Sequence, residues 1–304
     1  MKIIITGSLG HISKPLTREL LEKGHSVTVI SSSEVRRKEI EDLRANAAIG
    51  SLEDANFLTE TFIGADAVYT MVPPGNYFDP NFDLLGHYHK IGNNYAQAIE
   101  KSGVKRVVNL STIGGNLSEG NGILIGAHDV EEILNKLPNV NLTHMRPVYF
   151  YYNLLAFADS IKNQGMIFAN YGKEKFPLVA PEDIAVAVAD EIVISDSENK
   201  TRYIVSDERS GNEIADIFGN AIGKPDLKWV VVSDEQVLDA LKSIGMQPKI
   251  AEGMIEMYSG MNTGLLMEDY EKNKPAQWGK VKLTAYAREF AKLLNNNKTG
   301  VADM

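Results

Sequence analysis

Short apolar runs and amphipathic segments alternate along the first half of the chain. The apolar runs, of which Ile3-Ile4-Ile5 is an example, predict buried strands at residues 2–5, 26–30, 47–49, 65–74, 103–112 and 141–145. The segments between them carry apolar residues at helical spacing and predict helices at residues 14–22, 53–62, 81–102 and 127–136. In the first half, Ser51 is also the expected N-cap of the helix over 53–62. Strands and helices in this order predict an α/β fold with a doubly wound parallel sheet and right-handed crossovers.

The second half has a different pattern. Pro181 with two acids opens an amphipathic helix there. Further strands are predicted at 200–206 and 227–232, further helices at 210–223, 233–243, 248–260 and 282–294, and a frayed tail at 295–304. We therefore predict a Rossmann core over 1–155 and a smaller α+β C-terminal lobe over 156–304, with a strand and helix around 178–206 returning to the core.

Composition narrows the class of protein. The chain has 304 residues, a net charge of −9 and no Cys. The acidic balance argues against a nucleic-acid partner, and no apolar run approaches the length of a membrane span. Without Cys there is neither a disulfide nor a thiolate metal site, which fits a cytoplasmic protein. We expect a small-molecule partner and no membrane, and the sequence leaves a homodimer or a protein partner open.

The turn after the first strand carries the strongest chemical signal. It reads Thr6-Gly7-Ser8-Leu9-Gly10-His11-Ile12-Ser13 and leads directly into a helix. Gly7 permits a tight turn, and Gly10 lets the backbone approach a pyrophosphate at the positive end of the helix. Ser13 stands where a third glycine is usual. The pattern predicts a dinucleotide-binding loop over Thr6–Ile12, and the alternative is an ordinary surface turn.

The end of the second strand bears on the choice of cofactor. It carries Ser31 and Ser32 rather than an acid, and Arg36 and Arg37 follow. An acid at this place binds the ribose hydroxyls of NAD, whereas hydroxyls and arginines accommodate the 2′-phosphate of NADP. We favour NADP(H) over NAD(H). The alternative is that both arginines lie on a solvated helix face, and the nearby Glu34 weakens the case for NADP(H).

The remaining strand ends complete the expected ligand edge of the sheet, at residues 71–75, 111–115 and 147–153. Four consecutive aromatic residues, Tyr149 to Tyr152, follow the sixth strand. They would form a wall for a flat apolar substrate, or they pack as ordinary core. His87 and His89 are two positions apart on a helix, so their side chains diverge and no metal site is expected.

Several motifs together resemble a known family. In order they are Thr6-Gly7-x-x-Gly10, Ala65-Asp66-Ala67-Val68 to Pro73-Pro74, Gly103-Val104-Lys105-Arg106 to Ser111-Thr112, and Met145-Arg146-Pro147. The chain is similar to NmrA-like proteins, which are atypical short-chain dehydrogenase/reductases, and within them to the NADPH-dependent quinone reductases. The resemblance implies nicotinamide-side contacts at Met71, Val72, Pro73, Ser111 and Pro147 to Tyr149. It places the 2′-phosphate at residues 31–37, although the Arg usual after the second strand is absent.

The usual catalytic pair of short-chain dehydrogenases, Tyr-x-x-x-Lys, is missing from the helix over 127–136. Two other matches, at Tyr171 and Tyr270, lie in polar segments far from that helix and are interpreted as coincidence. Some relatives keep a Lys at the start of the helix, where this chain has Ala127-His128. We take His128 and Tyr149 as the candidate catalytic residues, and the alternative for His128 is a surface position.

The absence of a Tyr general acid favours the reduction of a quinone over the reduction of a ketone. Reduction of a ketone needs a proton donor at the oxygen, whereas a reduced quinone can be protonated by solvent. We therefore expect an NAD(P)H-dependent oxidoreductase that transfers a hydride to a quinone-like or other carbonyl acceptor. The alternative is an NAD(P)-binding redox sensor with little or no turnover.

Overall fold

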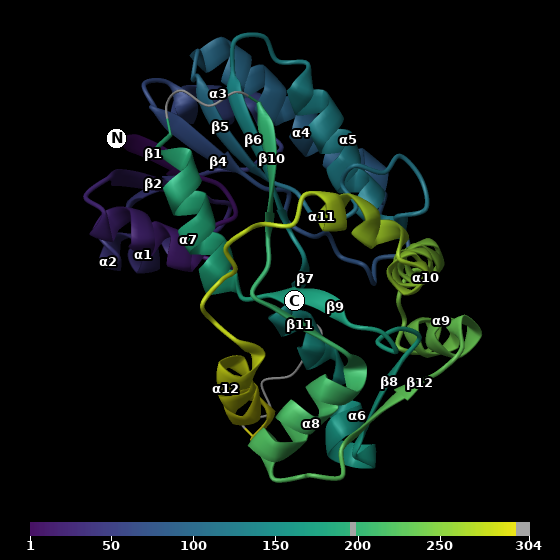
Figure 1. Cartoon of the computed structure of the whole chain (residues 1–304). Helices are drawn as coiled ribbons and strands as arrows, with labels where there is room; N and C mark the ends of the chain where they lie inside the picture. The colour runs from purple at the N-terminus through teal and green to yellow at the C-terminus, as the bar shows by residue number, and fades with distance from the viewer. Residues whose placement is uncertain (195–198, 296–304) are drawn as a thin grey trace.

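A seven-stranded parallel sheet forms the centre of the protein (Figure 1), in the order β10-β6-β5-β4-β1-β2-β3. The computed structural model describes residues 1–194 and 199–295, so all but the first residue of the tail predicted over 295–304 lies outside it. The strands are β1 (Lys2–Ile5), β2 (Ser26–Ser31), β3 (Asn46–Ile49), β4 (Ala67–Thr70), β5 (Arg106–Leu110), β6 (Asn141–Pro147) and β10 (Lys200–Ile204). The predicted doubly wound α/β sheet is confirmed.

Helices cover both faces of this sheet. One face carries α1 (Ser13–Glu22), α2 (Arg36–Asp42) and α7 (Pro181–Ile192), and the other carries α3 (Ala55–Phe62), α4 (Leu84–Ser102) and α5 (Ile125–Asn135). Successive side chains of a strand point to opposite faces of the sheet, so each strand contributes to the apolar core on both faces. Ile3 and Ile5 pack with the first group of helices, and Ile4 packs with the second. The two apolar clusters stabilise the sheet from both faces, and the loops that follow the strands lie along its carboxyl edge.

A smaller lobe lies below that edge in Figure 1. Its strands are β7 (Tyr149–Phe150), β9 (Phe176–Val179) and β11 (Asp207–Arg209) in one sheet, and β8 (Met166–Ala169) paired with β12 (Lys228–Val231). Its helices are η2 (Tyr151–Phe157), α6 (Ala158–Gln164), α8 (Gly211–Ile222) and α12 (Leu283–Asn295). The lobe has its own core, in which Phe218 stacks on Phe290 and Trp229 contacts Tyr171.

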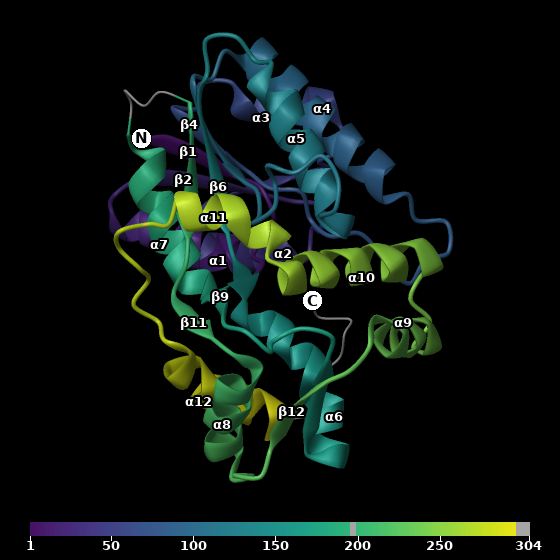
Figure 2. The ribbon, with the colours of Figure 1, turned by 45° about the vertical axis from the view of Figure 1, so that its right-hand side comes forward.

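An arm of helices leads from this lobe back to the central sheet. It consists of α9 (Asp234–Ser243), α10 (Pro248–Thr263), η3 (Leu265–Met267) and α11 (Glu268–Lys272). In Figure 2, α10 passes beneath the ends of α4 and α5. It packs against η1 (Gly122–Leu124), and Tyr270 of α11 belongs to the core of the sheet. The chain therefore returns to the core three times after residue 156, through α7, β10 and α11.

Two helix starts differ from the sequence prediction. Ser51 is not the N-cap of α3, because Asp54 accepts hydrogen bonds from the backbone N–H groups of Asn56 and Phe57. The long helix α4 begins at Leu84 rather than at residue 81, since Asp83 caps it. Both corrections have one cause: an acidic side chain nearer the helix captures its first free N–H groups. Among the described residues, no helix is long and apolar enough to cross a membrane.

Candidate functional site

The loop after β1 adopts the tight geometry expected of it. Gly7 has a φ of 85°, and a Cβ there would lie 2.7 Å from Sδ of Met71. Thr6 is fully buried, and its hydroxyl accepts a hydrogen bond from the Met71 N–H at 2.9 Å. Ser13 donates to the Thr6 carbonyl at 3.0 Å, so it takes the place of the usual third glycine without opening the helix–strand contact.

The outer side of the same loop is open. Gly10 is exposed, and a Cβ built on it would meet only the Gly7 carbonyl, at 3.3 Å. The N–H groups of Ile12 and Ser13 have no acceptor among the described residues. They lie at the start of α1, where the helix dipole favours a negative charge. A diphosphate would fit this cradle, and the binding of a nucleotide here stays a prediction.

Next to this loop, Ser31 is already engaged. Its buried hydroxyl accepts hydrogen bonds from Ser8 at 3.0 Å and from the Ser33 N–H at 3.3 Å, while Ser32 is exposed. Ser8 itself has a positive φ of 54°. Ser31 therefore joins the first two loops, and Ser32 is the hydroxyl that faces outward.

The two predicted phosphate-binding arginines lie at the start of α2 and pair with nearby acids. Arg36 contacts Glu39 at 2.6 Å, and Lys14 of α1 reaches the same carboxylate at 2.8 Å. Arg37 forms an ion pair with Glu34, and this hydrogen bond lowers the pKa of Glu34. Water screens exposed ion pairs of this kind, so they are weak. A phosphate can therefore compete for these side chains at small cost.

The residues assigned to the nicotinamide side gather at the ends of β4, β5 and β6. The Met71 carbonyl accepts from the Tyr95 hydroxyl at 2.6 Å, and the Pro73 carbonyl accepts from His87 Nε2 at 2.9 Å. The Pro147 carbonyl accepts from the Ile113 N–H at 2.9 Å. Val72 faces away, into the core behind β4.

Two hydroxyls near these strand ends lack partners. The Oγ of Ser111 and the phenol oxygen of Tyr69 are buried, and neither has a hydrogen-bond partner among the described residues. Burial without a partner also raises the pKa of Tyr69. Buried polar atoms are rarely left unsatisfied, so each of the two hydroxyls marks a place where a polar ligand group would be favourable.

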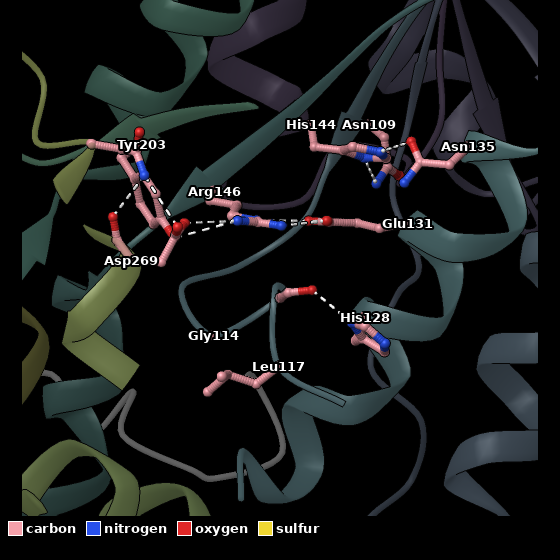
Figure 3. Close-up of polar contacts among 12 residues, drawn as sticks. Asn109, Gly114, Leu117, His128, Glu131, Asn135, His144, Arg146, Tyr203 and Asp269 are labelled. Atoms are coloured by element: carbon pink, nitrogen blue, oxygen red, sulfur yellow. Dashed lines mark hydrogen bonds and ion pairs between the residues drawn. The ribbon is translucent and has the colours of Figure 1, made fainter. Parts of the chain in front are cut away.

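His128 lies in the first turn of α5 and faces a polar cavity of about 310 Å³. Its Nδ1 lies 2.9 Å from the Gly115 carbonyl oxygen, and this hydrogen bond is the dashed line at His128 in Figure 3. A carbonyl only accepts, so Nδ1 carries the proton and the lone pair is on Nε2. No described residue contacts that Nε2. His128 is therefore oriented as an acceptor or, when protonated, as a donor.

A buried ion-pair network borders the same cavity (Figure 3). Arg146 of β6 holds Glu131 of α5 through two hydrogen bonds, at 2.9 and 2.6 Å. It also contacts Asp269 of α11 at 3.1 Å, and Asp269 accepts from the Tyr203 hydroxyl at 2.6 Å. Burial lowers the pKa of Arg146, but the hydrogen bonds and the charge of the Glu131 carboxylate have the larger combined effect, so the pKa is raised. This network joins the arm to the core and fixes the helix that carries His128.

Tyr149 lies elsewhere, in the aromatic core of the smaller lobe. Its hydroxyl is 2.8 Å from that of Tyr171, and burial raises its pKa to about 12. The structure does not bring Tyr149 and His128 into contact. Both Tyr-x-x-x-Lys matches are engaged with acids. Lys175 binds Glu213, while Lys274 lies over the Tyr270 ring at 5.2 Å and shares Glu208 with the Tyr270 hydroxyl.

One contact at the ligand edge has no counterpart in the sequence prediction. His11 stacks on Tyr152 with a centroid distance of 4.5 Å, and Tyr152 stacks on Phe150 at 5.0 Å. The sequence placed His11 in the nucleotide loop and Tyr152 in an aromatic wall, but nothing local indicated that the two meet. Only the fold brings the first loop and the segment after β6 together.

Three comparisons with known proteins bear on this site. A family model described as the NmrA-like family matches residues 1–289. NAD(P)H azoreductase of Xenophilus azovorans is 23% identical over 261 residues, covering 84% of this chain and 86% of the relative.

Solved structures share the fold. An NADPH-dependent quinone oxidoreductase from Escherichia coli, complexed with NADPH, has a TM-score of 0.81 at 18% identity, covering 95% of this chain and 99% of its own. Triphenylmethane reductase from Citrobacter sp. has a TM-score of 0.76 at 20% identity, covering 96% and 99%.

Proposed function

The chain belongs to the NmrA-like family, and from this premise we propose that it is an NAD(P)H-dependent reductase whose acceptor is a quinone-like or other conjugated carbonyl compound. The open cradle at Gly10 and the start of α1 carries this proposal, because it presents free N–H groups where a diphosphate would lie. The names of the azoreductase and of the quinone oxidoreductase support the reaction class.

The chain's own residues supply positioning rather than strong acid catalysis. A reduced nicotinamide, when bound, supplies the hydride. Thr6 and Met71 hold the first and fourth strand ends together, which keeps the cofactor loop in register with the acceptor side. His128 is oriented by Gly115, and Nε2 donates a hydrogen bond to the oxygen of the substrate only when the imidazole is protonated. Hydride transfer then depends on holding two flat rings face to face.

We further propose a preference for NADP(H) over NAD(H). Lys14, Arg36 and Arg37 place three cations beside the first loop and the end of β2, and two of them share Glu39. A 2′-phosphate would replace weak exposed pairs with stronger charge-assisted hydrogen bonds. The relative's name, NAD(P)H azoreductase, is compatible with either coenzyme.

A second candidate is a redox sensor that binds the coenzyme and turns over little. One observation favours it: α5 contains neither Tyr nor Lys, and the residue before His128 is Ala127. The choice between the two functions rests on turnover, since both require the same nucleotide cradle.

Absorbance at the NADPH band, followed with a panel of quinones and azo compounds, tests the proposal. We expect saturable oxidation of NADPH and a fall in kcat of about tenfold for His128→Ala, the lower range for a lost proton-handling side chain. His25→Ala, at the opposite edge of the sheet, is the matched control. Tight NADPH binding without turnover of any acceptor would instead support the sensor.

A further inference from the structure

The stack of His11, Tyr152 and Phe150 joins two of the loops that form the ligand edge. The rings are nearly parallel, with interplanar angles of 19° and 18°. His11 directly follows Gly10 of the nucleotide cradle, and Tyr152 lies in η2, directly after β7. The stack therefore places a flat aromatic surface beside the expected path of the coenzyme.

Tyr152 differs from the tyrosines around it in having an unused hydroxyl. The hydroxyl of the adjacent Tyr151 donates to the Val281 carbonyl at 3.0 Å, and that of Tyr149 bonds to Tyr171. No hydrogen bond among the described residues involves the hydroxyl of Tyr152, and the side chain is half-buried. A phenol left unpaired at a ligand edge is available to a ligand.

The surroundings of Tyr152 keep this phenol protonated. Burial, with a smaller contribution from Tyr77, raises its pKa, so the group remains a donor throughout the ordinary pH range. Such a phenol is a weak acid but a competent hydrogen-bond donor. It suits a carbonyl oxygen or an azo nitrogen, both of which only accept.

We infer that Tyr152 binds the acceptor: its hydroxyl donates to the acceptor's oxygen or nitrogen, and the three-ring stack that it holds together with His11 and Phe150 packs against a planar conjugated molecule. This inference rests on the proposed function. The hydride carries two electrons and one hydrogen to the acceptor, and water supplies the proton that completes the reduction. Tyr152 keeps its own proton, so it is a positioning and specificity-determining residue. Aliphatic carbonyl compounds, which cannot stack, bind more weakly.

Binding without turnover tests the inference directly. Protein saturated with NADP⁺ cannot transfer a hydride, so calorimetric titration with 1,4-naphthoquinone measures acceptor binding alone. We expect Tyr152→Leu, which removes the ring, to weaken the quinone at least tenfold, and Tyr152→Phe, which removes only the hydroxyl, to weaken it about threefold. Tyr286→Phe is the matched control, because it deletes another unpartnered phenol that lies within the small-lobe core.

Kinetics give a second readout. With NADPH as donor, Tyr152→Leu raises KM for naphthoquinone more than for the one-ring benzoquinone, and kcat changes less than KM. The affinity for NADP⁺ and the melting temperature stay within twofold and about 2 °C of the wild type.

Four outcomes are decisive. Unchanged quinone affinity in Tyr152→Leu overturns the inference, and so does a wild type that binds no naphthoquinone. An equal loss of NADP⁺ affinity overturns it too, because Tyr152 then serves the nucleotide loop through His11. Normal quinone binding that depends on Tyr152, without turnover, supports the inference and refutes the proposed reductase.

Discussion

Two glycine-rich loops lie at the same edge of the central sheet, one after β1 and one after β5, and they serve opposite purposes. In the first, Gly10 is exposed, and a Cβ there would meet only the Gly7 carbonyl, at 3.3 Å. In the second, Gly114 and Gly122 are covered: a Cβ on Gly114 would lie 2.7 Å from Leu266, and one on Gly122 would lie 1.9 Å from the Gly253 carbonyl. The first loop leaves its backbone free for a ligand, whereas the second admits the arm. A glycine-rich loop therefore indicates that something packs closely against its backbone, but it does not show whether that is a ligand or another part of the chain.

Substitution in the second loop should destabilise the protein most. Gly122→Ala combines a φ of 56° with a collision against the backbone of α10, so we expect a loss of about 3 kcal/mol and a fall in melting temperature of roughly 5 °C. Gly24→Ala is the matched control, because its φ of 82° is equally unfavourable but nothing lies within 4 Å of the new Cβ. Equal melting temperatures for the two variants would mean that α10 does not dock on Gly122.

The first loop should respond through binding rather than stability. Gly10→Asp places a side chain and a charge in the cradle, so we expect nucleotide affinity to fall at least about 100-fold by calorimetry, with little change in melting temperature. Gly10→Ala, whose Cβ meets only the Gly7 carbonyl, separates bulk from charge and should weaken binding less. Wild-type affinity in Gly10→Asp would remove this loop from the site.

The arginines beside the first loop sharpen the comparison further. We expect replacement of both Arg36 and Arg37 by Ala to weaken NADPH about tenfold, since two charge-assisted contacts to the 2′-phosphate would be lost, and to change NADH less than twofold. Lys38→Ala, exposed on the same helix, controls for net charge. Parallel losses for both coenzymes would show that the arginines do not distinguish them.

Ser13 gives the smallest effect. Ser13→Ala removes a buried hydrogen bond to the Thr6 carbonyl, so we expect about 1 kcal/mol of lost stability in thermal melting and no change in nucleotide affinity. Ser13→Gly, which restores the usual residue, should behave similarly. A variant that melts normally but binds the nucleotide poorly would place the Ser13 hydroxyl on the ligand instead.

The sheet was predictable because its signals are local and repeated. Each buried strand reads as an apolar run, and the turn at Gly7 follows its strand and precedes its helix without interruption. The shortest strands were not predicted: β7 has only two residues and exists because it pairs with β9. The cap of α3 was misassigned because Ser51 and Asp54 are both good capping residues, and only the backbone turn between them selects Asp54.

In the candidate site, too, features made by neighbouring residues were predictable and contacts between distant residues were not. The nucleotide loop was predicted in full from contiguous residues, and its role in binding stays a prediction. The unpaired Tyr152 beside His11 and the link from Arg146 to Asp269 join residues far apart in the chain, and no local pattern marks such pairs.

The order and spacing of neighbouring residues are enough to indicate the family, the parallel sheet and the position of the nucleotide loop. Tertiary structure alone decided which glycine loop stays open and which is covered by α10, and which of four consecutive aromatic residues keeps an unused hydroxyl. The physical reason is that exposure and hydrogen-bond satisfaction depend on what packs above a residue, and the packing partners come from distant parts of the chain.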